Sequence, residues 1–322
     1  MSGVLVVMEQ RGGTLNRMSL EALAAGAALA AKLGVGCSVA LLGAKLYSGG
    51  IVGNGRMAEF YSVEHPLLEQ YTADGYVAAL EQLIKKLEPA YVVFPHTYQV
   101  RDFAPALATR FGQVLISDVV AIHDGPVFVR QLLQGKLNAD YRQISAGPCF
   151  VSVQAGSFRA DESQGEAKAV ETFTPELDAA QIRTKPGEPF REAAHTVDLS
   201  AAAVIVSVGR GIGEQEKIGV VEELATALGA EMAASRPICD NGWLPMERQV
   251  GSSGQTVAPK LYLAVGISGA IQHLVGMKGS KSVIAINKDE NAPIFEVADY
   301  GVVGDLFEIV PALTKAVLAA KA

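Results

Sequence analysis

The stretch Leu261 to Met277 reads LYLAVGISGAIQHLVGM. Its first five residues are an apolar run typical of a buried strand, Gly266-Ile267-Ser268-Gly269 follows, and a helical pattern carrying Gln272 and His273 comes next. The loop therefore joins the carboxyl end of a strand to the N-terminus of a helix. Free backbone N–H groups and the helix dipole favour an anion there, and the glycines let a ligand approach the backbone closely. The sequence predicts a phosphate site at this loop.

The segments on both sides repeat the strand–turn–helix pattern. The predicted strands are Ala203 to Val208, Ala230 to Ala233, Ser282 to Ile286, Ile294 to Ala298 and Tyr300 to Val303, and the predicted helices are Glu214 to Leu228 and Leu306 to Ala320. Alternation of this kind is typical of a doubly wound α/β fold with a mostly parallel sheet and helices on both faces. We expect this C-terminal domain to span residues 199–322.

The N-terminal part follows the same rhythm at first. Its predicted strands are Val4 to Met8, Ser38 to Leu42, Glu59 to Val63 and Tyr91 to Phe94, with helices at Ser19 to Leu33, Tyr76 to Leu87 and Phe103 to Phe111. Val114 to Ile122 follows, with Asp118 inside it. Three short runs are typical of antiparallel strands appended to the sheet: Val127 to Leu132, Leu137 to Ile144 and Cys149 to Val153. Glu162 to Phe190 is typical of a partly extended connector ending near Leu199. We expect a second α/β domain over residues 1–198.

Composition limits the classes of function. The 322 residues are 49% hydrophobic and 19% charged, with a net charge of -7 and no basic run, which argues against nucleic acid as the main partner. No apolar run approaches the roughly 20 residues that cross a bilayer, and no signal peptide precedes the first strand, so we expect a cytoplasmic protein without membrane insertion, or a processed mitochondrial one. Cys37, Cys149 and Cys239 are widely spaced, as buried thiols in a reducing compartment are.

Polar residues follow several predicted strands of the C-terminal domain. They are Ser235-Arg236, the Ser268 loop, Asn287-Lys288 and Asp305. In an open α/β sheet, ligands bind at the carboxyl ends of the strands, so these residues are expected to converge on one crevice. Pro237 disfavours helical geometry at Arg236 and should help to fix the direction of its guanidinium. The inventory fits a nucleotide cofactor.

Other nucleotide and catalytic motifs are missing. The turn after Val208 has Glu214 where a dinucleotide fingerprint needs glycine, and a tight strand-to-helix connection explains its glycines as well as ligand contact does. No Walker lysine motif, metal-ligand spacing or GxSxG is present. His65, His123 and His195 lie in polar or loop contexts typical of structural or solvated residues. What remains is an arginine, a histidine, small hydroxyls and backbone amides. Such groups tune the electronics of a cofactor.

Five ordered motifs carry a family resemblance: SRPICDNGWLP, QVGSSG, APKLYLAVGISGAIQHLVGM, AINKDENAPIF and VADYGVVGDLF. Together they resemble the FAD domain of the electron transfer flavoprotein alpha subunit, densely from Ala203 to Leu313. PHTYQVRDFAPALA and SDVV extend the resemblance more loosely into the N-terminal domain. The resemblance implies bound FAD and no catalytic or metal-binding residue.

The resemblance also implies roles for individual residues. Arg236 matches the arginine over the isoalloxazine ring, Gln272 and His273 the pair at its pyrimidine side, and Ser268 the phosphate-side loop. Asn287, Lys288 and Asp305 match positions around the adenosine half. The full set of implied FAD-binding residues is Ser235, Arg236, Gln249, Gly251, Ser252, Ser253, Gly254, Gly266, Ile267, Ser268, Gly269, Ala270, Gln272, His273, Asn287, Lys288, Asp305 and Leu306.

The sequence departs from the family at one point. The family commonly has Gln-Thr-Gly where this chain has Ser252-Ser253-Gly254. Ser253 keeps a hydroxyl at the position that contacts flavin N5, whereas Ser252 shortens the first side chain. We expect the N5 contact to persist in a changed ring environment.

The function implied by the resemblance is that of one half of an alpha/beta heterodimer. Its FAD accepts electrons from flavin dehydrogenases, as in fatty acid β-oxidation, and passes them to a quinone reductase or another acceptor. A bifurcating, NADH-oxidising complex is implied if the beta subunit holds a second FAD. Two alternatives stay open on the residues alone: a nucleotide-dependent oxidoreductase acting on a small molecule, and a flavin-free adenine-nucleotide-binding scaffold subunit.

Overall fold

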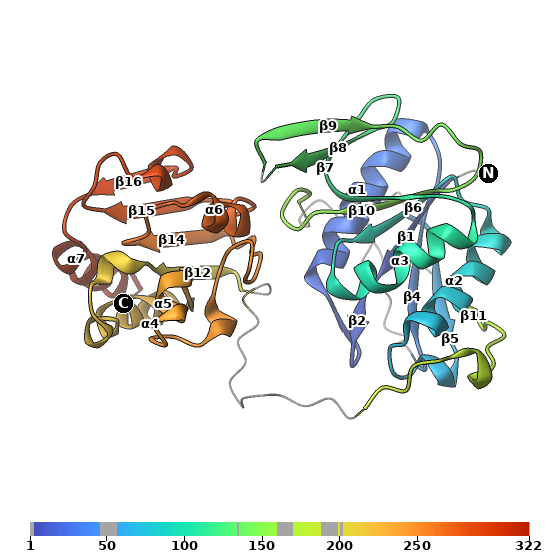
Figure 1. Cartoon of the computed structure of the whole chain (residues 1–322), viewed down its shortest axis with the longest axis horizontal. Helices are drawn as coiled ribbons and strands as arrows, with labels where there is room; N and C mark the ends of the chain where they lie inside the picture. The colour runs from blue at the N-terminus through green and yellow to red at the C-terminus, as the bar shows by residue number, and fades with distance from the viewer. Residues whose placement is uncertain are drawn as a thin grey trace. The chain divides into compact units, whose positions relative to one another are not determined.

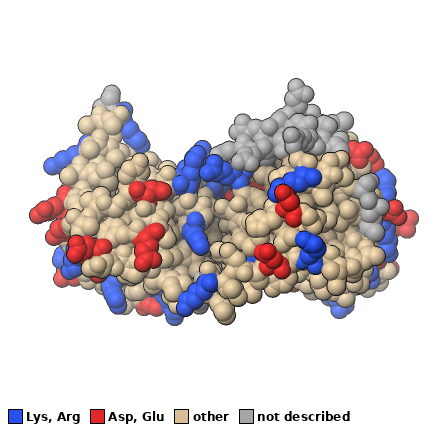
Figure 2. Space-filling model, turned by 90° about the horizontal axis from the view of Figure 1, so that it is seen from above, with Lys and Arg blue, Asp and Glu red and all other residues tan. Residues whose placement is uncertain are grey.

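The computed structural model describes residues 3–45, 57–133, 135–159, 170–187, 199 and 202–321. The chain divides into two compact units, which we call unit 1 (residues 1–189) and unit 2 (residues 190–322). Figure 1 shows that each unit is a sheet with helices packed on it. No helix in the described ranges is long and apolar enough to cross a membrane. On the face drawn in Figure 2, basic and acidic side chains are interspersed.

Unit 1 is built on a sheet that has nine strands among the described residues. In spatial order they are β11 (Val170–Phe173), β5 (Met57–Glu64), β4 (Cys37–Gly43), β1 (Val4–Met8), β6 (Tyr91–Pro95), β10 (Cys149–Val153), β7 (Leu115–His123), β8 (Val127–Leu132) and β9 (Leu137–Tyr141). Pairing is parallel from β11 to β7, and β7, β8 and β9 pair antiparallel. A small hairpin of β2 (Gln10–Arg11) and β3 (Thr14–Leu15) follows β1.

Helices cover both faces of this sheet. Helix α1 (Arg17–Leu33) packs on the face that carries Val4 and Val6, while α2 (Ala73–Leu87) and α3 (Tyr98–Arg110) pack on the face of Leu5 and Val7. The alternation along β1 follows from the two-residue period of a strand, and both faces are apolar because both are buried. Helix α1 can approach β1 closely because Gly26 has no side chain; a Cβ there would lie 2.3 Å from a methyl of Val6.

Unit 2 holds a parallel sheet with the order β13 (Glu231–Ala234), β12 (Val204–Val208), β14 (Leu261–Val265), β15 (Val283–Asn287) and β16 (Tyr300–Val303). Helices α4 (Gly219–Leu228) and α7 (Leu306–Lys321) share a core with one face. Helix α6 (Ile271–Met277) packs on the other, where Met277 joins Ile205 and Tyr262. This is the expected doubly wound α/β arrangement, and it places the ends of β12, β13, β14 and β15 along one edge.

The structure corrects three predictions for strands. Cys149 to Val153 is not an appended antiparallel strand: β10 lies between β6 and β7, parallel to both and fully buried. The predicted connector contains β11, which extends the sheet beside β5 and carries Glu171, paired with Lys86 at 2.8 Å. Ile294 to Ala298 is not a strand, because Pro293–Glu296 forms a 3₁₀ turn after a proline that fixes its φ.

Two helix predictions are also corrected. The predicted helix Glu214 to Leu228 begins only at Gly219, after the 3₁₀ turns Arg210–Ile212 and Gln215–Lys217. Pro237 does not keep Arg236 out of a helix, because Arg236 is the first residue of α5 (Arg236–Asp240). Proline is tolerated in a first helical turn, where its missing N–H would have no intrahelical partner. The parts of the predicted connector at residues 162–169 and 188–198 lie outside the described residues.

Candidate functional site

Unit 2 contains a cavity of about 720 Å³ at the carboxyl edge of its sheet. Its walls come from the turns after β12, β13, β14 and β15 and from the segment that precedes β14. The predicted residues that line it are Ser235, Arg236, Gln249, Gly251, Ser252, Ser253, Gly266, Ile267, Ser268, Ala270, Gln272, His273, Asn287 and Lys288. The structure therefore brings together most of the residues that the sequence singled out.

Close backbone packing explains the glycines after β12 and β14. A Cβ at Gly209 would lie 2.4 Å from the carbonyl oxygen of Gly266, and one at Gly211 would lie 2.8 Å from the Gly266 Cα. Gly211 N also donates to the Gly266 carbonyl oxygen at 2.9 Å. The two turns support each other, and Gly211 and Gly213 also line the cavity. Tight packing and a position at the cavity therefore both account for the glycines in the turn after β12.

The segment Gln249 to Gly254 packs on α6 to form a second wall. Ser252 N donates to the Gln272 carbonyl oxygen at 2.7 Å, and a Cβ at Gly276 would lie 2.3 Å from Gly251 N. Gln249 Nε2 donates to Ser253 Oγ at 2.9 Å, which fixes the direction of that hydroxyl. Gly254 does not line the cavity; its Cβ position is blocked by the Gln249 carbonyl oxygen at 2.4 Å.

Gln249 supplies an acceptor without a partner. Its side chain is 1% exposed, and its Oε1 makes no hydrogen bond within the described part of the chain. A buried amide oxygen left unpaired costs roughly 1–3 kcal/mol. Because Gln249 lines the cavity, a ligand with an O–H or N–H group is the partner that this oxygen lacks.

The charged side chains of the cavity are mostly cationic. Arg210, Arg236 and Lys288 line it, with Asp289 as the anionic member. Arg236 Nε donates to Asp240 Oδ2 at 3.1 Å, one turn along α5, so the guanidinium is oriented by a carboxylate on its own helix. A surplus of positive charge suits a phosphate-bearing ligand.

His273 forms a buried part of the wall. Its Nε2 lies 2.9 Å from the hydroxyl of Tyr262, which β14 places beneath α6. Burial lowers the pKa of His273 to about 4, against the weaker effect of the Val250 carbonyl. The ring is therefore neutral near pH 7 and acts through polarity.

Asn287 stabilises the cavity wall through two hydrogen bonds to the backbone. Its Nδ2 donates to the Ile267 carbonyl oxygen at 2.9 Å, and its Oδ1 accepts from Asp289 N at 3.0 Å. Three further predicted residues, like Gly254, do not line the cavity. Gly269 packs where a Cβ would lie 2.1 Å from Ile294 N, Asp305 Oδ1 accepts from Phe307 N at the start of α7, and Leu306 packs against Gly266.

Several lining residues were not among the predicted ones. They are Arg210, Gly211, Gly213, Pro237, Val250, Asp289, Ala292 and Pro293. Arg210 and the two glycines follow a predicted strand, so the rule that ligands bind at carboxyl strand ends was sufficient to include them. The others enter through the packing of neighbouring turns, which spacing in the sequence does not indicate.

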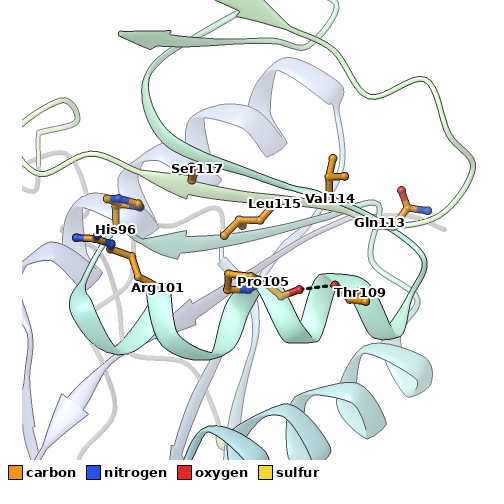
Figure 3. A pocket seen from close by; sticks show the side chains of 8 residues that line it. All are labelled: His96, Arg101, Pro105, Thr109, Gln113, Val114, Leu115 and Ser117. Carbon is orange, nitrogen blue, oxygen red and sulfur yellow. Dashed lines mark hydrogen bonds between the residues drawn. The ribbon is translucent and has the colours of Figure 1, made fainter. Parts of the chain in front are cut away.

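Unit 1 has a shallower groove of about 400 Å³ between α3 and the start of β7. Figure 3 shows His96 and Arg101 together at one end, with Pro105 and Leu115 along the groove. His96 Nδ1 lies 2.9 Å from Ser152 Oγ, and its pKa is lowered mainly by burial. Thr109 donates to the Pro105 carbonyl oxygen, and Gln113 to that of Ala146, so the polar groups at the other end are bonded within unit 1.

Comparison with protein families assigns both halves of the chain. Residues 4–178 match the electron transfer flavoprotein domain, and residues 198–278 match the electron transfer flavoprotein FAD-binding domain. The second match contains the turns after β12, β13 and β14 and the whole of α6.

Curated relatives agree over the full length. The chain is 38% identical to the electron transfer flavoprotein subunit alpha of Thermoanaerobacterium thermosaccharolyticum, with 96% of each protein covered, and 39% identical to that of Bacillus subtilis, with 97% and 96% covered. A mitochondrial alpha subunit from Oryza sativa is 36% identical over 97% of this chain and 89% of its own. A putative thiamin diphosphate-dependent enzyme of Mycobacterium smegmatis aligns at a TM-score of 0.23 and 15% identity, over 93% of this chain and 53% of its own, too remotely to bear on fold or function.

Proposed function

The chain belongs to the electron transfer flavoprotein alpha subunit family, and we propose that the cavity of unit 2 is where it holds its FAD. The observation that carries this proposal is the position of the cavity. Most of its walls come from residues inside the segment that matches the FAD-binding domain. The residues proposed to bind FAD remain those named from the sequence, with Arg210 added.

The groups at the cavity fit FAD chemically. Arg210 and Lys288 supply positive charge for a diphosphate, and the buried Oε1 of Gln249 accepts from a hydroxyl or ring N–H. Ile267, Val250 and Pro293 supply apolar contact. A volume of about 720 Å³ lies within the usual range of cofactor sites.

The one-electron chemistry belongs to the flavin, and the chain supplies binding, orientation and electrostatics. Arg236 keeps a permanent positive charge at the cavity, held in direction by Asp240. Such a charge stabilises negative charge that develops on a reduced ring. His273 is neutral and polarises its surroundings without adding charge, while Gln249 directs the Ser253 hydroxyl.

The direct test is the flavin content of the protein produced together with its beta subunit. We expect one FAD bound through unit 2, and Arg236→Ala should weaken its binding about tenfold and lower its reduction potential, because a cation near the reduced ring is lost. Arg236→Lys is the matched control, which keeps the charge and should keep most of the potential. A wild-type protein that takes up no FAD would refute the proposal.

We also propose that unit 1 supplies the surface that meets the beta subunit. Three large apolar side chains near the groove support this: Tyr98 is 83% exposed, Val114 75% and Ile144 97%. Val114 lines the groove, and Ser145, next to Ile144, donates to Gln113 at its rim. Exposed apolar groups beside a concavity are typical of a surface that a partner covers.

Substitutions at this surface test the interface. Ile144→Asp and Val114→Asp should each weaken the heterodimer about thirtyfold, because a charge would be buried in an apolar contact. Leu318→Asp, at an exposed apolar residue of α7, is the matched control. If analytical ultracentrifugation gives Ile144→Asp and Val114→Asp the same heterodimer dissociation constant as Leu318→Asp and the wild type, the interface lies elsewhere.

The proposed place of the protein is between flavin dehydrogenases, such as those of fatty acid β-oxidation, and a quinone reductase or other acceptor, in the cytoplasm. The domain boundary at residues 198 and 199 is likewise a proposal, supported by the FAD-binding domain match that begins at residue 198, while the compact units divide nine residues earlier, at residues 189 and 190. Reduction of the heterodimer by a dehydrogenase with its substrate, followed by reoxidation with a quinone reductase, tests the electron path. Rapid reduction by NADH alone would instead support a bifurcating complex.

A further inference from the structure

His273 has a hydrogen-bond partner that does not line the cavity. Tyr262 is 0% exposed and belongs to the middle strand of the sheet, and its Oη lies 2.9 Å from His273 Nε2. The two rings meet edge to face, with centroids 6.1 Å apart and an interplanar angle of 60°. His273 itself is only 6% exposed, so the phenol is its main polar neighbour on that side.

The direction of this hydrogen bond follows from the other groups around the ring. His273 Nδ1 is buried at the cavity wall and makes no hydrogen bond within the described residues, so a proton on it is available to a ligand. A neutral imidazole carries one proton; if Nε2 held it, the Tyr262 hydroxyl would accept from His273 and its own proton would need another acceptor, whereas Ser207 Oγ makes no hydrogen bond within the described residues. The arrangement that satisfies the phenol is the one with the proton on Nδ1. Nε2 is then an acceptor, and the Tyr262 hydroxyl is the donor.

Ser207 is the other polar side chain close to the Tyr262 hydroxyl. Its hydroxyl is completely buried on β12, makes no aligned hydrogen bond within the described ranges, and lies close enough to oppose the rise in the pKa of Tyr262 that burial causes. The charged side chains that line the same cavity are Arg210, Arg236, Lys288 and Asp289, and none of them accounts for the lowered pKa of His273. Burial and these neutral neighbours set the state of the ring.

We propose that Tyr262 is a positioning residue whose hydroxyl donates to His273 Nε2 and thereby holds the imidazole neutral, in one tautomer and one orientation, at the wall of the cofactor cavity. The inference rests on the proposed function, because His273 matters to FAD only if the cavity holds it. Tyr262 touches no ligand in this account. It keeps the proton on Nδ1, so that the wall offers the cofactor a fixed dipole.

The consequence for electron transfer concerns the source of positive charge. With Nε2 occupied by a donor, protonation of His273 requires the phenol to turn away inside a packed core. The ring therefore stays neutral when the flavin is reduced, and Arg236 is the residue that supplies a charge. The pH dependence of the flavin potential should show no step from His273 near neutral pH.

Tyr262→Phe tests the proposal, because it removes the donor and keeps the aromatic ring. The intact heterodimer, with nitrogen-15 in the histidine rings of this chain only, is titrated by NMR with and without FAD. The chain has 5 histidines, and His273→Ala identifies the signal of interest. Tyr76→Phe, at another buried tyrosine, in α2 of unit 1, is the matched control.

We expect the wild type to show a protonated Nδ1 and an unprotonated Nε2. In Tyr262→Phe the pKa of His273 should rise by about 0.7, because the neutral ring loses a hydrogen bond that favours it, and FAD binding should weaken about fivefold. Tyr76→Phe should change neither. A wild-type proton on Nε2, or a pKa that stays or falls in Tyr262→Phe, overturns the proposal.

The two proposals fail separately. If Tyr262→Phe behaves like the wild type while FAD binds at one site, the positioning role is wrong and the cofactor site stands. If the wild type takes up no FAD, the cofactor site is wrong whatever the NMR signals show. Should Tyr262→Phe not fold, the tautomer of the wild type still decides the direction of the hydrogen bond, which is the core of the inference.

Discussion

Each unit has its own sheet with helices on both faces, wholly parallel in unit 2 and parallel from β11 to β7 in unit 1, yet the carboxyl edges of the parallel strands differ. In unit 2 the turns after β12 and β14 are short and rich in glycine, and a cavity opens beside them. In unit 1 the corresponding ends of β1 and β6 carry Glu9 and Thr97, which bond to each other. Both folds align the carboxyl ends of parallel strands along one edge. The residues that follow those ends determine whether a cavity forms there.

The closed edge of unit 1 is a network of side chains. The Glu9 carboxylate, largely buried, accepts from Thr97 Oγ1 and from Asn16 Nδ2, and its backbone bonds to Ser19 Oγ. Thr97 also caps α3 by accepting from Val100 N at 3.1 Å. These groups satisfy one another, whereas Gln249 in unit 2 is left with an unpaired oxygen. Unpaired polar atoms at an open edge indicate a missing ligand, and paired ones do not.

The largest expected effect comes from Gly269→Ala in unit 2. Gly269 has φ +86, and the new Cβ would lie 2.1 Å from Ile294 N, so the backbone must move. We expect a loss of about 4 kcal/mol in the free energy of unfolding, together with loss of bound FAD. Gly213→Ala is the control: its φ is +81, but a Cβ there meets nothing within 4 Å. Equal stability of the two variants in denaturant titrations would show that close packing does not shape the cavity.

The second effect is a pH dependence. The pKa of His273 is lowered from 6.5 to about 4, so the unfolded chain binds an extra proton between these values. Stability should rise with pH through this window and be level above it, by about 3 kcal/mol in total from this group. His273→Gln should remove that part of the slope. The difference between the two unfolding curves measures it, and parallel curves would mean that His273 is not buried as a neutral ring.

The third effect belongs to the closed edge. Thr97→Val keeps the shape but removes both the donor to Glu9 and the cap of α3, and should cost about 2 kcal/mol. FAD binding should be unchanged, because Thr97 lies in unit 1 and the cavity residues lie in unit 2. Calorimetric unfolding and FAD titration of the same preparation check both parts. Weakened FAD binding would mean that the two edges are not independent.

The smallest effect is expected at Asp240. Asp240→Asn removes an exposed ion pair with Arg236, which contributes at most about 0.5 kcal/mol to stability. FAD affinity should fall by a factor of about two, since the guanidinium keeps its charge and loses only its orientation. Isothermal titration resolves such a change. A tenfold loss would assign Asp240 a direct role at the cofactor.

Much of unit 2 could be predicted from the sequence because its signals are local. The apolar run before Gly266 and the helical spacing after it lie within one stretch, and the rule for carboxyl strand ends brought Arg236, Ser268 and Lys288 to the same cavity. Ile294 to Ala298 failed because a short apolar run after a proline satisfies a strand and a 3₁₀ turn equally well. The hydrogen-bond partner of His273 could not be predicted. Side chains alternate between the two faces of β14, and only the folded structure shows that the face carrying Tyr262 packs against α6.

Unit 1 shows the limit more clearly. The position of β10 between β6 and β7 depends on a long connection through β8 and β9, and no local pattern distinguishes it from an appended strand. The left-handed conformation of Asp118, with φ +60, was likewise invisible in the sequence, although the residue stood out within its strand. Long-range pairing, more than local propensity, decided these features.

The central claim is that FAD occupies the cavity of unit 2, and filling that cavity tests it most directly. Ala270 lines the cavity with an exposed side chain, so Ala270→Trp would place an indole where the cofactor binds. Thr226→Trp, exposed on α4 away from the lining, is the matched control. Isothermal titration of the apo heterodimers with FAD should show one site in the wild type and in Thr226→Trp, and at least about a hundredfold loss in Ala270→Trp. Equal affinity in all three proteins would contradict the account.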